Sequence, residues 1–180
     1  MRVISGTLKG RRLFAPRGLG VRPTSDKVRE ALFSILADRI KGASLLDLYA
    51  GCGSVGIEAL SRGSGGVVFV ERNRKHVQYL RKNLAACSLK EGFQIVEKNA
   101  SDFLKKADRS FDFIFIDPPY AGNEIEKVLP RLKEGDIIGK TGELIIEHFH
   151  KKHPPEKIGN ALLLKRYKYG ETVLSFYGTQ

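Results

Sequence analysis

The stretch LLDLYAGCGSVG, residues 45–56, decides the fold class of this 180-residue chain. A short apolar run of strand type leads into a G-x-G-x-x-G pattern at Gly51, Gly53 and Gly56, and a helical pattern follows it. Glycines at such a turn let the backbone approach a nucleotide-type ligand at the start of a helix. The stretch therefore predicts the strand, turn and helix that open a nucleotide-binding α/β sheet.

Outward from this stretch, apolar runs alternate with helical patterns in the rhythm of βαβ units. Runs of Val, Ile, Leu and Phe without polar alternation suit parallel strands that are covered on both faces. The expected strands are residues 45–49, 67–71, 93–97, 111–117, 143–148, 161–169 and 171–177, and the expected helices lie near residues 25–40, 57–60, 77–87, 103–104 and 125–132. The last two strands meet at Gly170 as a hairpin. The pattern predicts an open, doubly wound sheet with ligands at the carboxyl ends of its strands.

Composition excludes several classes of protein. With 42% hydrophobic and 28% charged residues, the chain has the profile of one globular domain. No run approaches the ~18 apolar residues of a membrane span, and no apolar segment of a secretory signal follows the basic N-terminus. Two cysteines, Cys52 and Cys87, are too few for a disulfide framework. We therefore expect a cytoplasmic protein with no membrane partner.

Basic charge is concentrated at the N-terminus. The net charge is +11, and residues 1–42 hold ten basic and three acidic side chains, a net +7, which leaves +4 for residues 43–180. Residues 1–25 contain no acid. Such an excess favours binding of a polyanion, with nucleic acid as the leading candidate. The expected RNA-binding residues are Lys9, Arg11, Arg12, Arg17 and Arg22.

Apolar residues are interleaved with these charges, which favours an ordered β-hairpin or arm over a solvated tail. A Gly/Pro-rich segment, residues 15–23, separates the arm from the first long helix. We therefore divide the chain into a basic N-terminal arm, residues 1–23, and a main domain, residues 24–180, within one compact unit. A merely solubilising tail is the alternative interpretation of the arm.

Two acidic residues indicate which ligand the glycine loop binds. Glu71 follows Gly51 by 20 residues at the end of the next strand, where an acid accepts hydrogen bonds from ribose hydroxyls. Asp47 precedes Gly51 by four residues. A carboxylate there opposes a diphosphate but complements a sulfonium and an ammonium group, so S-adenosylmethionine fits better than NAD. The alternative for Asp47 is a turn or helix-capping residue.

A second motif, Asp117-Pro118-Pro119-Tyr120, follows the strand FDFIFI. Two prolines stiffen the turn and remove two donors, so it presents a carboxylate and carbonyls beside an aromatic ring. This group suits a planar exocyclic amine, whose two N–H bonds can be held by Asp117 and the Pro118 carbonyl while Tyr120 stacks on the base. A rigid turn at the end of a strand is the alternative.

The segments DLYAGCGSVG, FVERN and DPPY, in this order, resemble class I S-adenosylmethionine-dependent methyltransferases that modify exocyclic amines. The opening segments RVISGTLKGRRL (2–13) and RPTSDKVREALFSIL (22–36) resemble the RsmD family, and the likeness spans essentially the whole chain. The resemblance implies methylation of a guanine N2 amine in 16S ribosomal RNA. It also implies a seven-stranded sheet with an antiparallel last strand, a monomer, and a partly assembled small ribosomal subunit as partner.

By this resemblance each motif residue receives an expected role. The methionine end of the cofactor is expected to lie against Asp47, Gly51 and Gly53, its ribose against Glu71, and its adenine against Asn99 and Ala100. The cofactor site also includes Tyr49 and Arg72. The catalytic turn consists of Asp117, Pro118, Pro119 and Tyr120. Asp117 either accepts the departing proton or only orients the amine. No metal is expected, and His148, His150 and His153 are interpreted as surface residues or RNA contacts.

Three alternatives share these motifs. The glycine loop and DPPY also occur in DNA adenine-N6 and cytosine-N4 methyltransferases. A non-catalytic RNA-binding module on the same fold would keep the basic arm, and an NAD-dependent oxidoreductase would keep the glycine pattern. Methyl-transfer assays on RNA and DNA and calorimetry with both cofactors separate them.

Overall fold

The computed structural model describes residues 1–16, 25–119, 124–134 and 137–179. Their strands are β1 (Ser44–Leu48), β2 (Gly66–Val70), β3 (Phe93–Val96), β4 (Phe111–Ile116), β5 (Ile138–Phe149), β6 (Lys157–Ile158), β7 (Ala161–Tyr169) and β8 (Thr172–Thr179). Their helices are α1 (Asp26–Leu36), the 3-10 helix η1 (Ala37–Ile40), α2 (Ser54–Ser61), α3 (Arg74–Ala86), α4 (Ala100–Leu104) and α5 (Glu124–Glu134). The order of elements confirms the alternating pattern expected from the sequence.

The described strands form one sheet in the order β3-β2-β1-β4-β5-β8-β7-β6. Strands β1 to β5 are parallel, whereas β8 is antiparallel to both of its neighbours, β5 and β7. The doubly wound class and the hairpin at Gly170 are therefore confirmed. The sheet differs from the expected seven strands by β6, a two-residue strand that pairs antiparallel with β7. Two residues are too short to give a periodic signal in the sequence.

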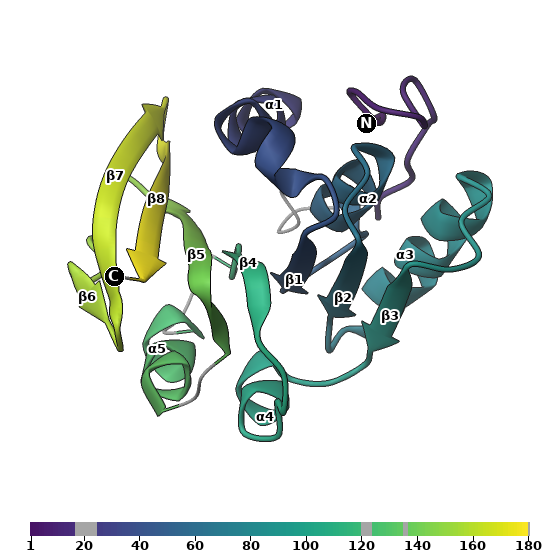
Figure 1. The fold of residues 1–180 in the computed structure, drawn as a ribbon. Coiled ribbons are helices and arrows are strands. Elements are labelled where there is room, and N and C mark those ends of the chain that lie inside the picture. Colours follow the sequence, from purple (N-terminus) through teal and green to yellow (C-terminus); the bar gives the residue numbers. More distant parts are fainter. Residues whose placement is uncertain (17–24, 120–123, 135–136, 180) are drawn as a thin grey trace.

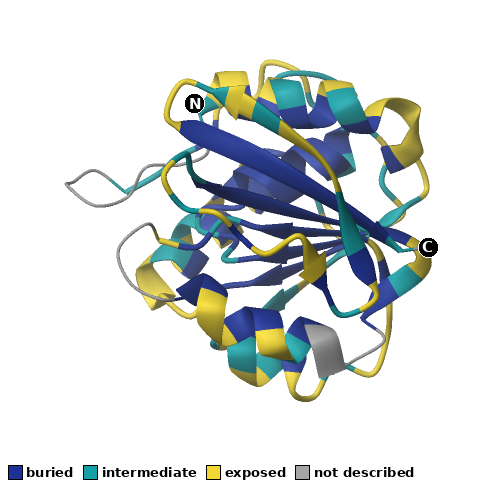
Figure 2. Cartoon of the chain, turned by 90° about the vertical axis from the view of Figure 1, so that its left-hand side faces the viewer, coloured by how far each residue is buried: buried dark blue, intermediate teal, exposed yellow. Residues whose placement is uncertain are grey.

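Helices cover both faces of the sheet, which Figure 2 shows as a buried layer between them. Successive strand residues alternate between the two cores: Leu45 packs with α1, α2 and α3, and Leu46 packs with α4 and α5. Both faces of β1, β2 and β4 are apolar for this reason, which is why these strands lack polar alternation. No helix in the described part of the chain is long and apolar enough to cross a membrane.

The helix expected over residues 25–40 is divided in two. Ser25 caps α1, since its Oγ accepts the Val28 N–H at 3.2 Å, and the α-helix ends at Leu36. Ala37 has a positive φ of 48°, and the chain continues as η1 to Ile40. The helical spacing of apolar residues persists through Ile40 because the 3-10 turn keeps that side chain in the core.

The N-terminal arm is part of the folded domain. The Val3 N–H donates to the Arg11 carbonyl and the Gly10 N–H to the Val3 carbonyl, both at 2.9 Å, which closes a short antiparallel loop. Val3 and Leu13 are buried in the same core as α1, α2 and α3. Figure 1 shows the arm lying against α2 and α3. Residues 1–16 thus have an ordered conformation, and the expected boundary at residue 23 lies outside the described residues.

Candidate active site

The site lies at the carboxyl edge of the sheet, where the direction of strand order reverses. From β1 the chain passes to β2 and β3 on one side, while β4 and β5 lie on the other. Leu48, the last residue of β1, is in register with Ile116, the last residue of β4. The glycine loop after β1 and the Asp117 turn after β4 therefore leave the sheet side by side. Ligands of open α/β sheets bind at this kind of position.

The glycine pattern serves both backbone conformation and packing. Gly51 and Gly53 have φ values of +55° and +83°, which favour glycine. A Cβ at Gly53 would lie 2.2 Å from Leu80 Cδ1, and one at Gly56 would lie 2.2 Å from Phe69 Cε1. The glycines therefore let the loop turn tightly and bring α2 close to β2 and α3.

Glu71 fixes the glycine loop from the neighbouring strand. Its Oε2 accepts the Gly51 N–H at 2.8 Å, and its Oε1 accepts the Asn73 N–H at 2.8 Å. The His76 Nδ1 lies 3.7 Å from Oε2. The carboxylate is buried at the end of β2, so it holds the loop in addition to the ribose-binding role expected for it.

Asp47 is a buried carboxyl beneath the same loop. It is 2% exposed, and its Oδ2 accepts the Gly56 N–H of α2 at 3.1 Å. Burial raises the pKa of Asp47 to about 7; the Gly56 hydrogen bond opposes this rise, and the charges of Asp117 and Glu71 add to it. Asp47 therefore bonds to the first turn of α2, whose N-cap residue is Gly53, and its role in cofactor binding stays a prediction.

The Asp117 turn follows β4 directly. Asp117 is half-buried, Pro118 is buried and Pro119 is exposed. The register of β1 with β4 brings the ends of the two strands together, so the two motifs of the sequence lie at the same edge of the sheet. Tyr120 lies outside the described residues, so its stacking role stays a prediction.

The remaining expected cofactor residues surround this edge. Tyr49 has a φ of +71°, and its hydroxyl lies 3.4 Å from both the carbonyl and the Oε2 of Glu124 in α5. Burial is the main cause that raises the Tyr49 pKa. Asn99 caps α4, since its Oδ1 accepts the Ser101 N–H at 2.9 Å. Ala100 is buried beside it, and Arg72 is exposed after Glu71.

The described cations of the arm are exposed. Lys9, Arg11 and Arg12 all lie on the surface, while Arg17 and Arg22 lie outside the described residues. The Arg12 guanidinium carbon is 5.8 Å, and the Lys82 Nζ 4.1 Å, from the centre of the Phe14 ring. Sequence reasoning missed Lys82, because it belongs to α3 and only the fold brings it to the arm.

Two buried polar residues that hold the arm were also missed. The Glu58 carboxylate on α2 accepts the Ile4 N–H at 2.8 Å and the Ser5 N–H at 2.9 Å. Asn83 on α3 bonds to both the arm and the glycine loop. Each pairs with backbone more than 50 residues away, and no sequence signal marks such partners.

One histidine interpretation is wrong. His148 is buried, and its Nε2 lies 2.8 Å from Ser175 Oγ. The reason is that β5 continues through Phe149 and pairs with β8, so His148 faces a neighbouring strand. Burial lowers the pKa of His148. Among the described residues, no group of His, Cys, Asp and Glu is placed to hold a metal ion.

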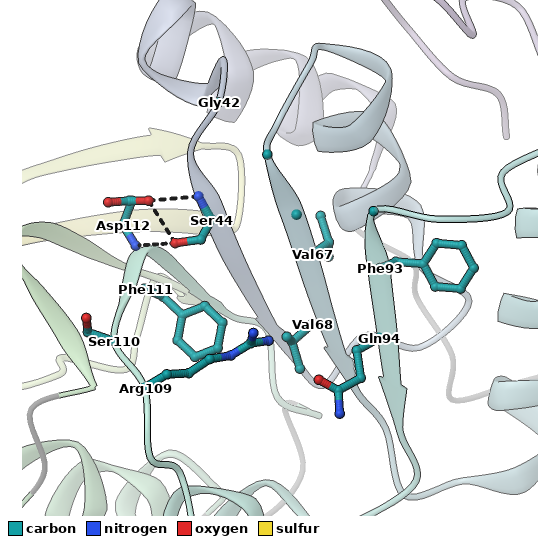
Figure 3. Close-up of a pocket in the computed structure, with 13 residues that line it drawn as sticks. Gly42, Ser44, Val67, Val68, Phe93, Gln94, Arg109, Ser110, Phe111 and Asp112 are labelled. Carbon is teal, nitrogen blue, oxygen red and sulfur yellow. Dashed lines mark hydrogen bonds between the residues drawn. The ribbon is translucent and has the colours of Figure 1, made fainter.

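A hollow of about 450 Å³ lies at the opposite, amino-terminal edge of the strands. Figure 3 shows Asp112 bonded to Ser44 at its rim and Arg109 beside Phe111. The hollow borders the starts of β1, β2, β3 and β4, so the full length of the strands separates it from the glycine loop. It takes no part in the site described above.

Comparison with known proteins agrees with this architecture. The family model "Conserved hypothetical protein 95" matches residues 1–178. "Putative rRNA methyltransferase YlbH" of Bacillus subtilis is 37% identical over 180 residues, covering 98% of each chain. "Ribosomal RNA small subunit methyltransferase D" of Escherichia coli is 38% identical over 148 residues, covering 82% of this chain and 74% of that protein.

A solved structure, "Putative methyltransferase yhhF from Escherichia coli", superposes with a TM-score of 0.88 at 32% identity, covering 100% of this chain and 98% of that one. The match includes the N-terminal arm as well as the sheet, since it extends over the full length. The chain therefore belongs to the Conserved hypothetical protein 95 family, which is the RsmD family that its sequence motifs resemble.

Proposed function

We propose that this chain transfers a methyl group from S-adenosylmethionine to the exocyclic N2 amine of a guanine in small-subunit ribosomal RNA. One observation carries the proposal. The glycine loop held by Glu71 and the Asp117 turn leave adjacent strands at the same switch point. Membership of a family with relatives named as small-subunit ribosomal RNA methyltransferases supports the choice of substrate.

The acids of the site fit a cationic cofactor. The charges of Asp117 and Glu71 help to raise the pKa of Asp47, so a ligand with ammonium and sulfonium groups relieves their repulsion, whereas a diphosphate increases it. S-adenosylmethionine supplies a reactive methyl group on its sulfonium. In this proposal the methionine end of the cofactor is held by Asp47, Tyr49, Gly51 and Gly53. Glu71 and Arg72 then hold the ribose, and Asn99 and Ala100 border the adenine.

Asp117 acts on the base. Its carboxylate and the Pro118 carbonyl accept the two N–H bonds of the guanine amine, which turns the nitrogen lone pair toward the methyl group. Asp117 is also placed to accept the proton that the amine loses. Pro119 stiffens the turn, and Tyr120 stacks on the ring. Most of the catalysis then comes from positioning, and no metal is required.

The target base must leave its stack to reach this edge. Unstacked bases of RNA occur in loops and bulges, where their edges are accessible. We infer a monomeric enzyme in the cytoplasm that meets its RNA within a partly assembled small subunit. The basic arm then contacts the phosphates beside the target base.

Mass spectrometry of nucleosides tests the proposal. Small ribosomal subunits from cells lacking the protein are incubated with the purified protein and isotope-labelled S-adenosylmethionine, in parallel with duplex DNA. We expect labelled N2-methylguanosine in the RNA and no label in the DNA. Labelled N6-methyladenine or N4-methylcytosine in DNA would support the DNA enzyme instead. Binding of RNA without transfer would support a non-catalytic module.

Salt dependence tests the role of the arm. Five phosphate contacts predict a slope near −3.5 in log affinity against log salt for single-stranded RNA, at roughly 0.7 per contact. Changing Lys9, Arg11 and Arg12 to glutamine should reduce the slope by about 2. Fluorescence anisotropy with a labelled RNA at several salt concentrations measures it.

The matched control changes three exposed cations near the amino-terminal edge, Lys106, Arg109 and Lys140, to glutamine. This triple variant loses the same charge but should keep the slope of the wild type. Equal loss of slope in both triple variants would show that net charge, and not the arm, determines RNA binding.

A further inference from the structure

Asn83 joins the basic arm to the glycine loop. It lies on α3 and is 0% exposed. Its Oδ1 accepts the Phe14 N–H at 2.7 Å, and its Nδ2 donates to the Phe14 carbonyl at 2.8 Å and to the Cys52 carbonyl at 2.9 Å. One buried amide thus pairs with the backbone of two segments that are 38 residues apart in the sequence.

The loop is held from two sides. Glu71 accepts the Gly51 N–H from β2, and Asn83 donates to the next carbonyl, that of Cys52, from α3. Movement of the Cys52 carbonyl changes the position of the Asn83 amide, since the bond is buried and water cannot replace it. The position of the loop therefore depends on a side chain that also binds the arm.

The Asn83 amide also holds the arm at Phe14, close to the cations of the arm. Phe14 makes two backbone hydrogen bonds to Asn83, and its ring is flanked by Arg12 and Lys82. Leu13, the residue before it, is a core residue. Fixing Phe14 therefore fixes the end of the arm that presents Arg11 and Arg12 to solvent.

We propose that Asn83 is a positioning residue through which cofactor binding at the glycine loop further restrains the already folded basic arm, so that the protein holding its cofactor presents a more rigid cationic surface to RNA. Coupling of this kind is reciprocal, so RNA bound to the arm also tightens the loop. The inference rests on the proposed function, since it takes the loop as the cofactor site and the arm as the RNA site.

Helix α2 offers a competing connection. It begins at the loop, and near its far end Ser61 Oγ accepts the Leu8 N–H at 3.0 Å and donates to the Ser5 carbonyl. Ser61→Ala removes these arm contacts without touching Cys52 or Phe14. It is therefore a matched control for Asn83→Ala, because both variants loosen the arm and only one also frees the loop.

Hydrogen exchange with S-adenosylhomocysteine as the probe separates the two connections. In the wild type, saturating ligand should slow exchange at the backbone amides of residues 3–14 by about fivefold or more. Ser61→Ala should retain this response, even where its exchange is faster throughout. Asn83→Ala should lose the response in the arm while the amides around Gly51 and Gly53 remain protected. A purely structural Asn83 would accelerate exchange with and without ligand by the same factor.

Each other outcome overturns the inference. Ligand that protects the wild-type loop but leaves the arm unchanged shows that no coupling exists, and this measurement needs no variant. Arm protection that survives in Asn83→Ala assigns the coupling elsewhere. If Asn83→Ala does not fold, Asn83→Asp replaces it, since the carboxylate keeps an acceptor for the Phe14 N–H and loses both donors. Wild-type protein that does not bind the ligand in calorimetry contradicts the proposed function itself.

Discussion

Replacing Asp117 by asparagine is expected to lower the rate of methyl transfer by about 10²- to 10⁴-fold, with affinity for S-adenosylhomocysteine within a few fold of the wild type. Asparagine keeps the size of the side chain but presents an N–H₂ group, a donor, where the guanine amine also donates. It also removes the acceptor for the departing proton. In the proposed function the cofactor contacts come from other elements, chiefly the glycine loop and Glu71, so we expect them to persist.

Single-turnover transfer to small ribosomal subunits measures the rate, and calorimetry measures the affinity. Asp102→Asn is the matched control, because Asp102 is an exposed acid on α4 whose carboxylate pairs with Lys105 at 3.0 Å. It should transfer at the wild-type rate. Normal turnover by Asp117→Asn would remove the turn after β4 from the mechanism.

Replacing Asp47 by asparagine should make the protein more stable and a poorer binder of its cofactor. The folded-state pKa of Asp47 is raised from 3.8 to about 7, so the folded state binds more protons than the unfolded state between these values. The stability that the protonated Asp47 carboxyl gives to the folded state is fully present below pH 4 and is lost as the pH rises to 7. The loss is on the order of 4 kcal/mol at pH 8, at 1.36 kcal/mol per pKa unit.

Asparagine can still accept the Gly56 N–H, and it carries no buried charge. Urea unfolding at several pH values from 4 to 8 should therefore show a stability advantage of Asp47→Asn over the wild type that grows with pH. Affinity for S-adenosylmethionine should fall at least tenfold at pH 8, since the neutral side chain no longer complements a cation. Asp102→Asn should follow the wild-type curve. Parallel curves for Asp47→Asn and wild type would show that this carboxyl does not titrate as described.

The sequence predicts the sheet because its information there is local. Each strand from β1 to β4 is a short and mainly apolar run, and each connection carries its own turn or helix signal. Strand β5 begins at Ile138, before the expected residue 143, because its first residues are partly polar and give no apolar run. The positions of Asp47, Glu71 and Asp117 at one edge follow directly, since parallel strands end on the same side. The break at Ala37 and the two-residue β6 have no such signal.

The attachment of the arm could not be predicted for a different reason. Glu58 and Asn83 are a charged and a polar residue within helical patterns, where solvent exposure is the ordinary expectation. Both are buried in polar contacts: Glu58 accepts hydrogen bonds from the backbone of the arm and pairs with Arg29 and Arg62, and Asn83 bonds to the backbone of Phe14. A pairing between one side chain and distant backbone leaves no periodicity in either segment. Glu71 was predicted as a ribose ligand, yet its bond to Gly51 also required the fold to be seen.

Burial of Val3 and Leu13 has a consequence for how this chain can be altered. These two apolar side chains pack among α1, α2 and α3, so their removal leaves a cavity in the core. Truncating one such side chain typically lowers the free energy of unfolding by about 2 to 5 kcal/mol. Proteolytic removal of the first sixteen residues would therefore inactivate the molecule by unfolding it, and not by weakening its binding to a polyanion. Single cations of the arm can be replaced to change the charge of the surface, but the arm as a whole cannot be removed without loss of the fold.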